Sequence, residues 1–275
     1  ALKAVEQNFN FDDPSASVQN LLRVRGMMRA LPDGFWKSKK LEELDEIIAH
    51  SLGLYLFAKT DDPIATAGQD IEIEVEATNR SNQPVKLVDY FIEGISMTRA
   101  YADTILAGNK PFKEEQVYSI LPILKSSGPY WLQKPWKLGM YTVEDQDLRG
   151  MGESEDPLMV NFIVEVAGER FTYRRPVRHT FTDRVMGEQV QPLEIMPPVF
   201  AELDKSSYLF TESKSTPVRI KVTAAQANLM GTVELRIPSD WKVTPAKTEI
   251  DIKRKGEEQY FEFMLTPPVG QTQGM

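Results

Sequence analysis

Side chains that could carry nucleophilic, acid–base or metal chemistry are scarce in this sequence of 275 residues. It contains two histidines, His50 and His179, which lie in unrelated local contexts, and it contains no cysteine. Catalytic zinc sites and acyl-transfer sites usually take their ligands, bases and nucleophiles from His and Cys. The composition therefore predicts a protein that is not an enzyme by itself and that uses no metal or other cofactor. Glycoside hydrolysis, which needs only two carboxylates, stays open, because sequence spacing does not give the distance between side chains.

Residues 144–156 form the densest acidic run and raise the question of a calcium loop. Such a loop needs oxygen ligands at alternate positions and a closing bidentate acid, roles for which Asp145, Asp147 and Glu153 could be considered. Their spacing does not match an EF-hand. We therefore expect a solvated acidic loop between strands.

Aromatic residues gather around turn residues between positions 128 and 141. Tyr130 and Trp131 follow Gly-Pro, and Trp136 and Tyr141 come shortly afterwards. The apolar face of a sugar packs on exposed aromatic rings, so this cluster could bind carbohydrate. The alternative is that the rings fill one end of a β core, because aromatic side chains bury large areas. Tyr130, Trp131 and Trp136 are the candidate ligand-binding residues.

One basic run, which contains Arg174, Arg175, Arg178 and Arg184, stands out against the acidic composition. Arginine can bind a carboxylate or phosphate ligand with two hydrogen bonds. A simpler expectation is that these arginines pair with glutamates of neighbouring strands. We expect the adjacent His179 to pack or to form a hydrogen bond.

The first 52 residues predict a helical hairpin. Asp13-Pro14 is a typical helix start, Pro32-Asp33-Gly34 interrupts the pattern, and a second helix is expected from about Ser38 to the glycine at position 53. Short helices are marginal in water unless their apolar faces are packed. We therefore expect six apolar residues to be shared between the interface of the hairpin and a neighbouring surface: Leu21, Leu22, Met28, Leu41, Leu44 and Ile48.

After residue 53 the apolar period changes to two, which is typical of strands. The alternating run 71–76 predicts a half-buried strand, and the runs around Ala167-Gly168 predict a hairpin. A proline-rich linker is expected near 192–198. The sequence thus predicts a mainly β protein with a short N-terminal helical hairpin and two immunoglobulin-like antiparallel β-sandwich domains. The expected bounds are 1–52 for the hairpin, 53–198 for the larger sandwich and 199–275 for the smaller one.

Charge and hydropathy exclude some partners. The net charge of −8 argues against nucleic acid, since phosphate binding needs a basic face. No apolar stretch approaches the roughly 20 residues of a membrane helix, so no membrane span is expected. The chain opens with Ala1, and we expect it to be a segment of a longer polypeptide.

Ordered motifs in this sequence resemble the region that follows the catalytic domain in long PIG-L/LmbE-type (GlcNAc-PI de-N-acetylase-like) deacetylases. The motifs are Pro129-Tyr130-Trp131-Leu132, Gly139-Met140-Tyr141, Arg175-Pro176-Val177 and the run from Phe181 to Val199. Residues 200–268 are similar to β-sandwich modules found beside the catalytic domains of α-galactosidases, in particular at 231–235 and 238–245.

The resemblance implies a non-catalytic accessory segment of a periplasmic or secreted carbohydrate deacetylase. A covalently linked catalytic domain upstream and a carbohydrate would be its partners. The zinc motif of the family, of the type Ala-His-Pro-Asp-Asp, is absent, because Ser51 follows His50 and Thr180 follows His179. No catalytic residue therefore carries over. The alternative is a free-standing structural or adhesin-like β-sandwich protein without an enzyme partner.

Overall fold

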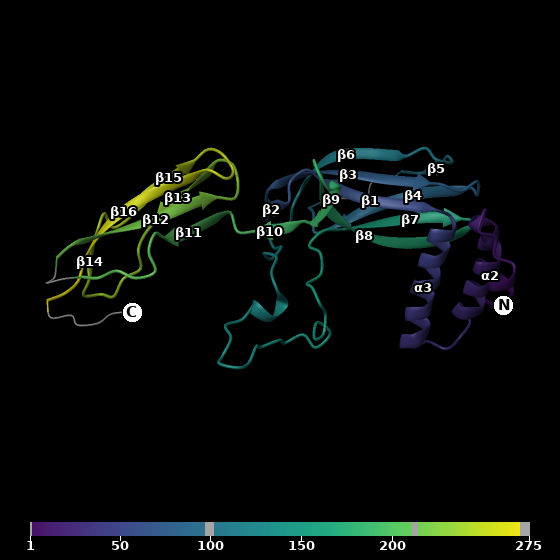
Figure 1. The fold of residues 1–275 in the computed structure, drawn as a ribbon, viewed down its shortest axis with the longest axis horizontal. Helices are drawn as coiled ribbons and strands as arrows, with labels where there is room; N and C mark the ends of the chain where they lie inside the picture. The colour runs from purple at the N-terminus through teal and green to yellow at the C-terminus, as the bar shows by residue number, and fades with distance from the viewer. Residues whose placement is uncertain (1, 97–101, 211–213, 270–275) are drawn as a thin grey trace. The chain divides into compact units, whose positions relative to one another are not determined.

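The structure is a computed structural model that describes residues 2–96, 102–210 and 214–269 (Figure 1). The expectation of a mainly β fold with N-terminal helices is confirmed. The described chain divides into two compact units. The larger comprises residues 1–63, 68–124 and 128–194, and the smaller comprises 64–67, 125–127 and 195–275.

The helical hairpin consists of α2 (Val18–Arg29) and α3 (Phe35–Ser51). A short helix α1 (Leu2–Gln7), which the sequence pattern did not predict, precedes it, and Pro14–Ser17 form a 3-10 turn. The expected start of the second helix at Ser38 is wrong by one turn. The helix begins at Phe35, and the amide of Ser38 donates to the carbonyl of Gly34.

Strands of the larger unit form one sheet that curls into a nearly closed barrel, with the hydrogen-bonded path β5-β4-β7-β8-β1-β3-β6 and with β9 paired to β8. The bounds of these strands are β1 (Leu54–Thr60), β3 (Asp70–Asn79), β4 (Val85–Glu93), β5 (Thr104–Leu106), β6 (Phe112–Ser119), β7 (Met159–Val166), β8 (Glu169–Asp183) and β9 (Gly187–Pro192).

Strand β8 is long and changes its pairing partner along its length, so it connects β7 on one side of the sheet to β1 on the other. Its first part pairs with β7 as far as Pro176, and the next residues pair with β1, so that Val177 lies beside Ala58. Proline donates no ladder hydrogen bond, and here it marks the change of partner. The β1–β8 pair is parallel, which corrects the expectation of a purely antiparallel fold. The larger unit is therefore built on a nearly closed barrel, and not on the first of the two immunoglobulin-like sandwiches that the sequence predicted.

The interior of the barrel is filled from opposite strands. Tyr90 on β4 and Tyr118 on β6 bring their hydroxyl oxygens to 3.5 Å from each other. Burial raises the pKa of both phenols, most strongly that of Tyr90. The Tyr90 ring also contacts Phe162 of β7, with ring centroids 6.4 Å apart. The contact between Tyr90 and Tyr118 joins strands that are not neighbours in the sheet, whereas Tyr90 and Phe162 lie opposite each other on the paired strands β4 and β7.

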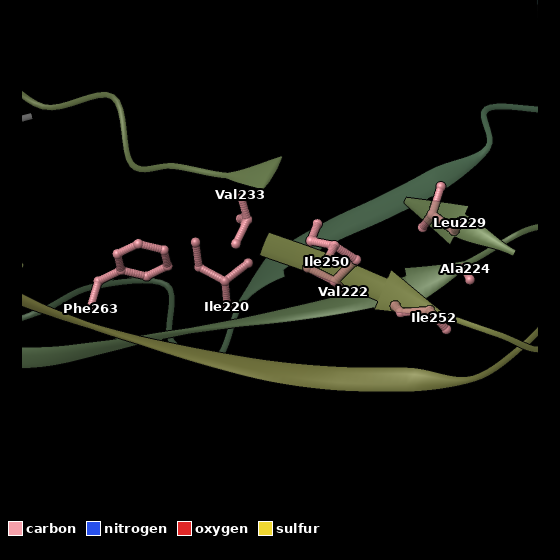
Figure 2. Close-up of a cluster of buried hydrophobic side chains, with 8 residues drawn as sticks. All are labelled: Ile220, Val222, Ala224, Leu229, Val233, Ile250, Ile252 and Phe263. Atoms are coloured by element: carbon pink, nitrogen blue, oxygen red, sulfur yellow. The ribbon is translucent and has the colours of Figure 1, made fainter. Parts of the chain in front are cut away.

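The smaller unit holds its own core, as Figure 2 shows. Its strands form two-stranded sheets β2–β10 and β13–β15 and the four-stranded sheet β11-β12-β16-β14. Along β12, residues 218, 220, 222 and 224 alternate with less buried residues, as expected for a strand with one buried face. The bounds are β2 (Ile64–Thr66), β10 (Glu194–Met196), β11 (Val199–Leu203), β12 (Thr216–Ala224), β13 (Leu229–Val233), β14 (Lys242–Thr244), β15 (Thr248–Ile252) and β16 (Glu258–Thr266).

Two further expectations concern the linker and the membrane. The proline-rich segment near 192–198 contains the end of β9 at Pro192 and the short strand β10, while Pro197 and Pro198 lie between β10 and β11, and the boundary between the two units falls at 194/195. Among the residues that the structure describes, no helix is both long enough and apolar enough to cross a membrane.

Candidate functional site

The candidate ligand-binding residues lie on the long connection between β6 and β7. We call residues 128–157 the aromatic loop. Apart from the 3-10 turn Tyr130–Leu132, it has no regular helix or strand. Figure 1 shows this connection as a long teal segment that projects away from the sheet. Most residues between 132 and 155 are exposed.

Tyr130 and Trp131 form the first part of the cluster. Both are half-buried, and their rings meet edge to face with centroids 4.9 Å apart. The Tyr130 hydroxyl donates to the carbonyl of Met151 at 3.3 Å, and the Ser154 hydroxyl donates to the carbonyl of Gly128 at 2.7 Å. These two hydrogen bonds tie the outgoing and returning arms of the aromatic loop together.

Trp136 and Tyr141 form the second part. Between them, Lys137 and Met140 exchange two backbone hydrogen bonds, of 3.1 and 2.8 Å, around a tight turn at Leu138-Gly139. Gly139 has a φ of 80°, which glycine adopts without strain. Trp136 is 62% exposed and Tyr141 60% exposed. The alternative that these aromatic rings fill the end of a β core is therefore wrong for both of these residues.

The basic run of β8 holds down the returning arm of the aromatic loop. Arg174 bonds Glu93 of β4 and Glu155, at 2.7 and 2.5 Å, and Arg178 bonds Asp156 at 2.9 Å. The sequence predicted that these arginines pair with acidic residues. It did not predict that two of the partners, Glu155 and Asp156, belong to the acidic run 144–156. The hydrogen bond from Arg174 lowers the pKa of Glu93, whereas burial raises that of Asp156.

The two histidines lie in different environments, one buried and one exposed. His179 is buried, its Nδ1 lies 3.1 Å from the carbonyl oxygen of Thr60, and its ring stacks on Phe181. This agrees with the expected packing and hydrogen-bonding role. His50 is exposed in the last turn of α3. Within the described residues, no three His, Asp or Glu side chains come together in an arrangement that could hold a metal ion.

An acidic cleft lies beside β1 and β3 of the larger unit and is lined in part by Glu72, Glu74 and Glu115. Burial opposes the ionisation of Glu74, yet hydrogen bonds from Lys113 and Lys59 lower its pKa overall. The lysine nitrogens lie 3.1 and 3.3 Å from its carboxylate. The lysines thus already neutralise the carboxylate at the centre of this cleft.

No protein-family model matches this sequence, and no curated protein matches it. The resemblance to deacetylase accessory regions therefore stays a hypothesis.

Proposed function

We propose that this chain is a non-catalytic accessory segment of a multidomain carbohydrate deacetylase and that its aromatic loop binds the glycan. The observation that carries the proposal is the exposure of Trp136 and Tyr141 on a loop whose arms are tied together. Large aromatic surface held in water has no benefit for the fold of a monomer, and such patches are typical of ligand-binding surfaces.

The surroundings of the rings suit a sugar. Lys134 forms an ion pair with Glu144 within the same loop, and Lys137 lies between the two exposed rings in sequence. Aromatic faces pack on the apolar face of a pyranose ring, and polar groups at the rim bond its hydroxyls. Tyr130 and Trp131 contact each other, and the Tyr130 hydroxyl bonds the carbonyl of Met151 across the loop.

In this proposal the chain positions a catalytic domain that is linked to it upstream, and the smaller unit acts as an immunoglobulin-like module. A deacetylase acting on surface or extracellular glycans would be periplasmic or secreted. The chain itself supplies binding and orientation rather than the hydrolytic step, since the motif of the zinc site is absent from its sequence.

Calorimetric titration of the chain with oligomers of N-acetylglucosamine and of glucosamine tests glycan binding. We expect binding, and we expect Trp136→Ala and Tyr141→Ala each to weaken it about tenfold, the effect of losing about 1.4 kcal/mol of aromatic contact. Tyr260→Ala is the matched control, because Tyr260 is equally exposed but lies on β16 of the smaller unit.

Two outcomes would contradict the proposal. If neither oligomer series binds at millimolar concentration, the aromatic loop is not a glycan site. Release of acetate by the isolated chain above background would show that the chain is catalytic and that the accessory role is wrong.

A further inference from the structure

The aromatic loop offers a long stretch of exposed chain to proteases. Between residues 132 and 155, every residue except Val143 and Leu148 is exposed. Hydrogen bonds between backbone groups of the loop join residues only three apart, as in the tight turn between Lys137 and Met140. A protease binds its substrate as an extended segment, so it cuts a native protein where the chain opens locally without unfolding a sheet. The aromatic loop meets this condition.

Two of the basic residues in the loop are poor cleavage points. Lys134 pairs with Glu144 and is followed by Pro135, whose ring fixes the backbone and removes the N–H of the bond to be cut. The guanidinium of Arg149 donates a hydrogen bond to the carbonyl of Val143 at 3.5 Å. A side chain that is held by its own loop must leave its partner before a protease can bind it, so cleavage after either residue is slowed.

Lys137 is the remaining basic residue of the loop. Among the described residues it forms no ion pair, and Leu138, which follows it, is 96% exposed. The tip of the loop, residues 133–143, contains lysines but no acidic residue. A protease of the trypsin type binds the basic side chain before the cut bond in a pocket that holds a carboxylate. The bond between Lys137 and Leu138 is therefore the one that suits such a protease best.

Strands from the two sides of the loop alternate in the sheet of the larger unit. β7 and β8 follow the loop in sequence, yet they lie between β4 and β1, which precede it. The ladder between β4 and β7 pairs residues 85–93 with residues 159–166. Phe162 of β7 is fully buried and contacts the ring of Tyr90 on β4. The chain before the loop and the chain after it therefore share one sheet and one core.

The helical hairpin also joins the two sides of the loop. Arg25 of α2 bonds Glu169 of β8 at 2.8 Å, and Arg175 of β8 bonds Glu46 of α3 at 2.8 Å. The apolar face of the hairpin is packed as well. Four of the six apolar residues expected at its interface are buried and two are half-buried: Leu21, Leu22, Leu44 and Ile48, then Met28 and Leu41. Both helices are thus fixed to a strand that follows the loop.

We propose that the aromatic loop is a processing site, at which a protease of the trypsin type hydrolyses the bond between Lys137 and Leu138, and that the two fragments stay together as one folded molecule. Water adds across the cut peptide bond, which leaves a carboxylate on Lys137 and an amine on Leu138. The fragments are residues 1–137 and 138–275. Their association is maintained by the β4–β7 and β1–β8 ladders and by the ion pairs between the hairpin and β8.

Limited digestion of the full chain with trypsin tests the proposal. Mass spectrometry of early time points identifies the first bond cut, and gel filtration shows whether the fragments separate. We expect the first cut between Lys137 and Leu138. The cut chain should elute with the uncut chain in buffer and as two separate fragments in urea.

Lys137→Gln should slow the cut at this bond by about tenfold or more, because it removes the charge that the protease pocket binds. Arg184→Gln is the matched control. Arg184 is also exposed and basic, but it lies in the short turn between the paired strands β8 and β9. The control should leave the rate of the first cut unchanged.

Three results would overturn the proposal. A first cut after Arg149 would show that another bond is the processing site. A first cut outside the loop, in the helical hairpin or in the smaller unit, would show that the loop is not preferred. Separation of the two fragments in buffer would show that the shared sheet does not hold them together.

The cut falls between the exposed rings of Trp136 and Tyr141, and we expect it to abolish glycan binding, an expectation that rests on the proposed function. Cleavage and association of the fragments are measured without a glycan. If the uncut chain binds no glycan, the proposed function fails while the processing site is still tested by the digestion.

Discussion

At the scale of single residues, Arg25 carries the most concentrated set of interactions in the hairpin. Its side chain is buried, it bonds two carboxylates, and its guanidinium lies 4.2 Å from the centroid of the Phe171 ring. The hydrogen bond to Asp45 is the largest of the effects that raise its pKa. Removing one partner of a buried ion pair leaves the other desolvated and unpaired, which costs more than the pair contributes.

Replacing Arg25 by Ala should therefore lower the free energy of unfolding by about 3 kcal/mol. Urea denaturation of the isolated chain measures the change as a lower midpoint at an unchanged slope. Lys40→Ala is the control, since it breaks only the exposed Lys40–Glu43 pair and should cost less than about 0.5 kcal/mol. An equal effect of the two substitutions would show that burial of Arg25 adds nothing.

The pH dependence of stability should contain a contribution from Glu93. Its carboxylate accepts hydrogen bonds from Arg174 and Asn161, and its pKa is lowered from the ordinary value of 4.5. A lowered pKa in the folded state means that the contribution is complete above pH 4.5 and is lost as the pH falls through the folded pKa. The Tm difference between the parent chain and Glu93→Gln should therefore be constant near neutrality and shrink in acid. A difference that grows below pH 4 would contradict this.

At the scale of elements, local chemistry was predictable and long-range pairing was not. Ala167-Gly168 predicted the β7–β8 turn, and both residues have positive φ, of 50° and 81°. The parallel pairing of Ala58 with Val177 has no local signal, because it depends on how the whole sheet curls. The aromatic residues could be proposed from their types and neighbours. Their exposure could not be predicted, because a turn motif does not show which other residues pack against its side chains.

Gly94 directly follows the end of β4, at a position where the backbone conformation and the close neighbours both exclude a side chain. Its φ is 86°, and a Cβ there would lie 2.6 Å from Leu158 Cδ2 and 2.9 Å from the Pro157 carbonyl oxygen. Gly94→Ala should destabilise the larger unit by about 2 kcal/mol or more, from backbone strain and overlap together. Gly168→Ala is the matched control, with a φ of 81° and open space around it. Thermal unfolding should show a clearly smaller loss for the control, and equal losses would mean that the overlap has no effect.

At the scale of the whole molecule, the chain has two cores built from separate sets of strands. Phe263 of β16 is fully buried in the cluster that Figure 2 shows, together with Ile220, Val233 and Ile250. None of these residues comes from the strands of the barrel. Each unit therefore has its own source of hydrophobic stability.

Phe263→Ala should remove about 3–5 kcal/mol from the smaller unit, the usual cost of a buried phenylalanine truncation. Hydrogen exchange should then show faster opening of β12 and β16, with unchanged protection of β7 and β8. Tyr260→Ala, an exposed aromatic of the same strand, is the control and should change little. Loss of protection in β7 and β8 as well would show that the two units unfold as one.

The pairing of β1 with β8 has a consequence for synthesis on the ribosome. Ala58 and Val177 are about 120 residues apart, so translation at roughly 5–20 residues per second separates their emergence by roughly 6–24 s. In that interval β1 can pair with β3, but its other edge has no strand to meet. An unpaired edge is the part of a sheet that nascent chains use to associate with one another. We therefore expect that chaperones, or slow expression at low concentration, reduce association through the free edge of β1 until β8 has been synthesised.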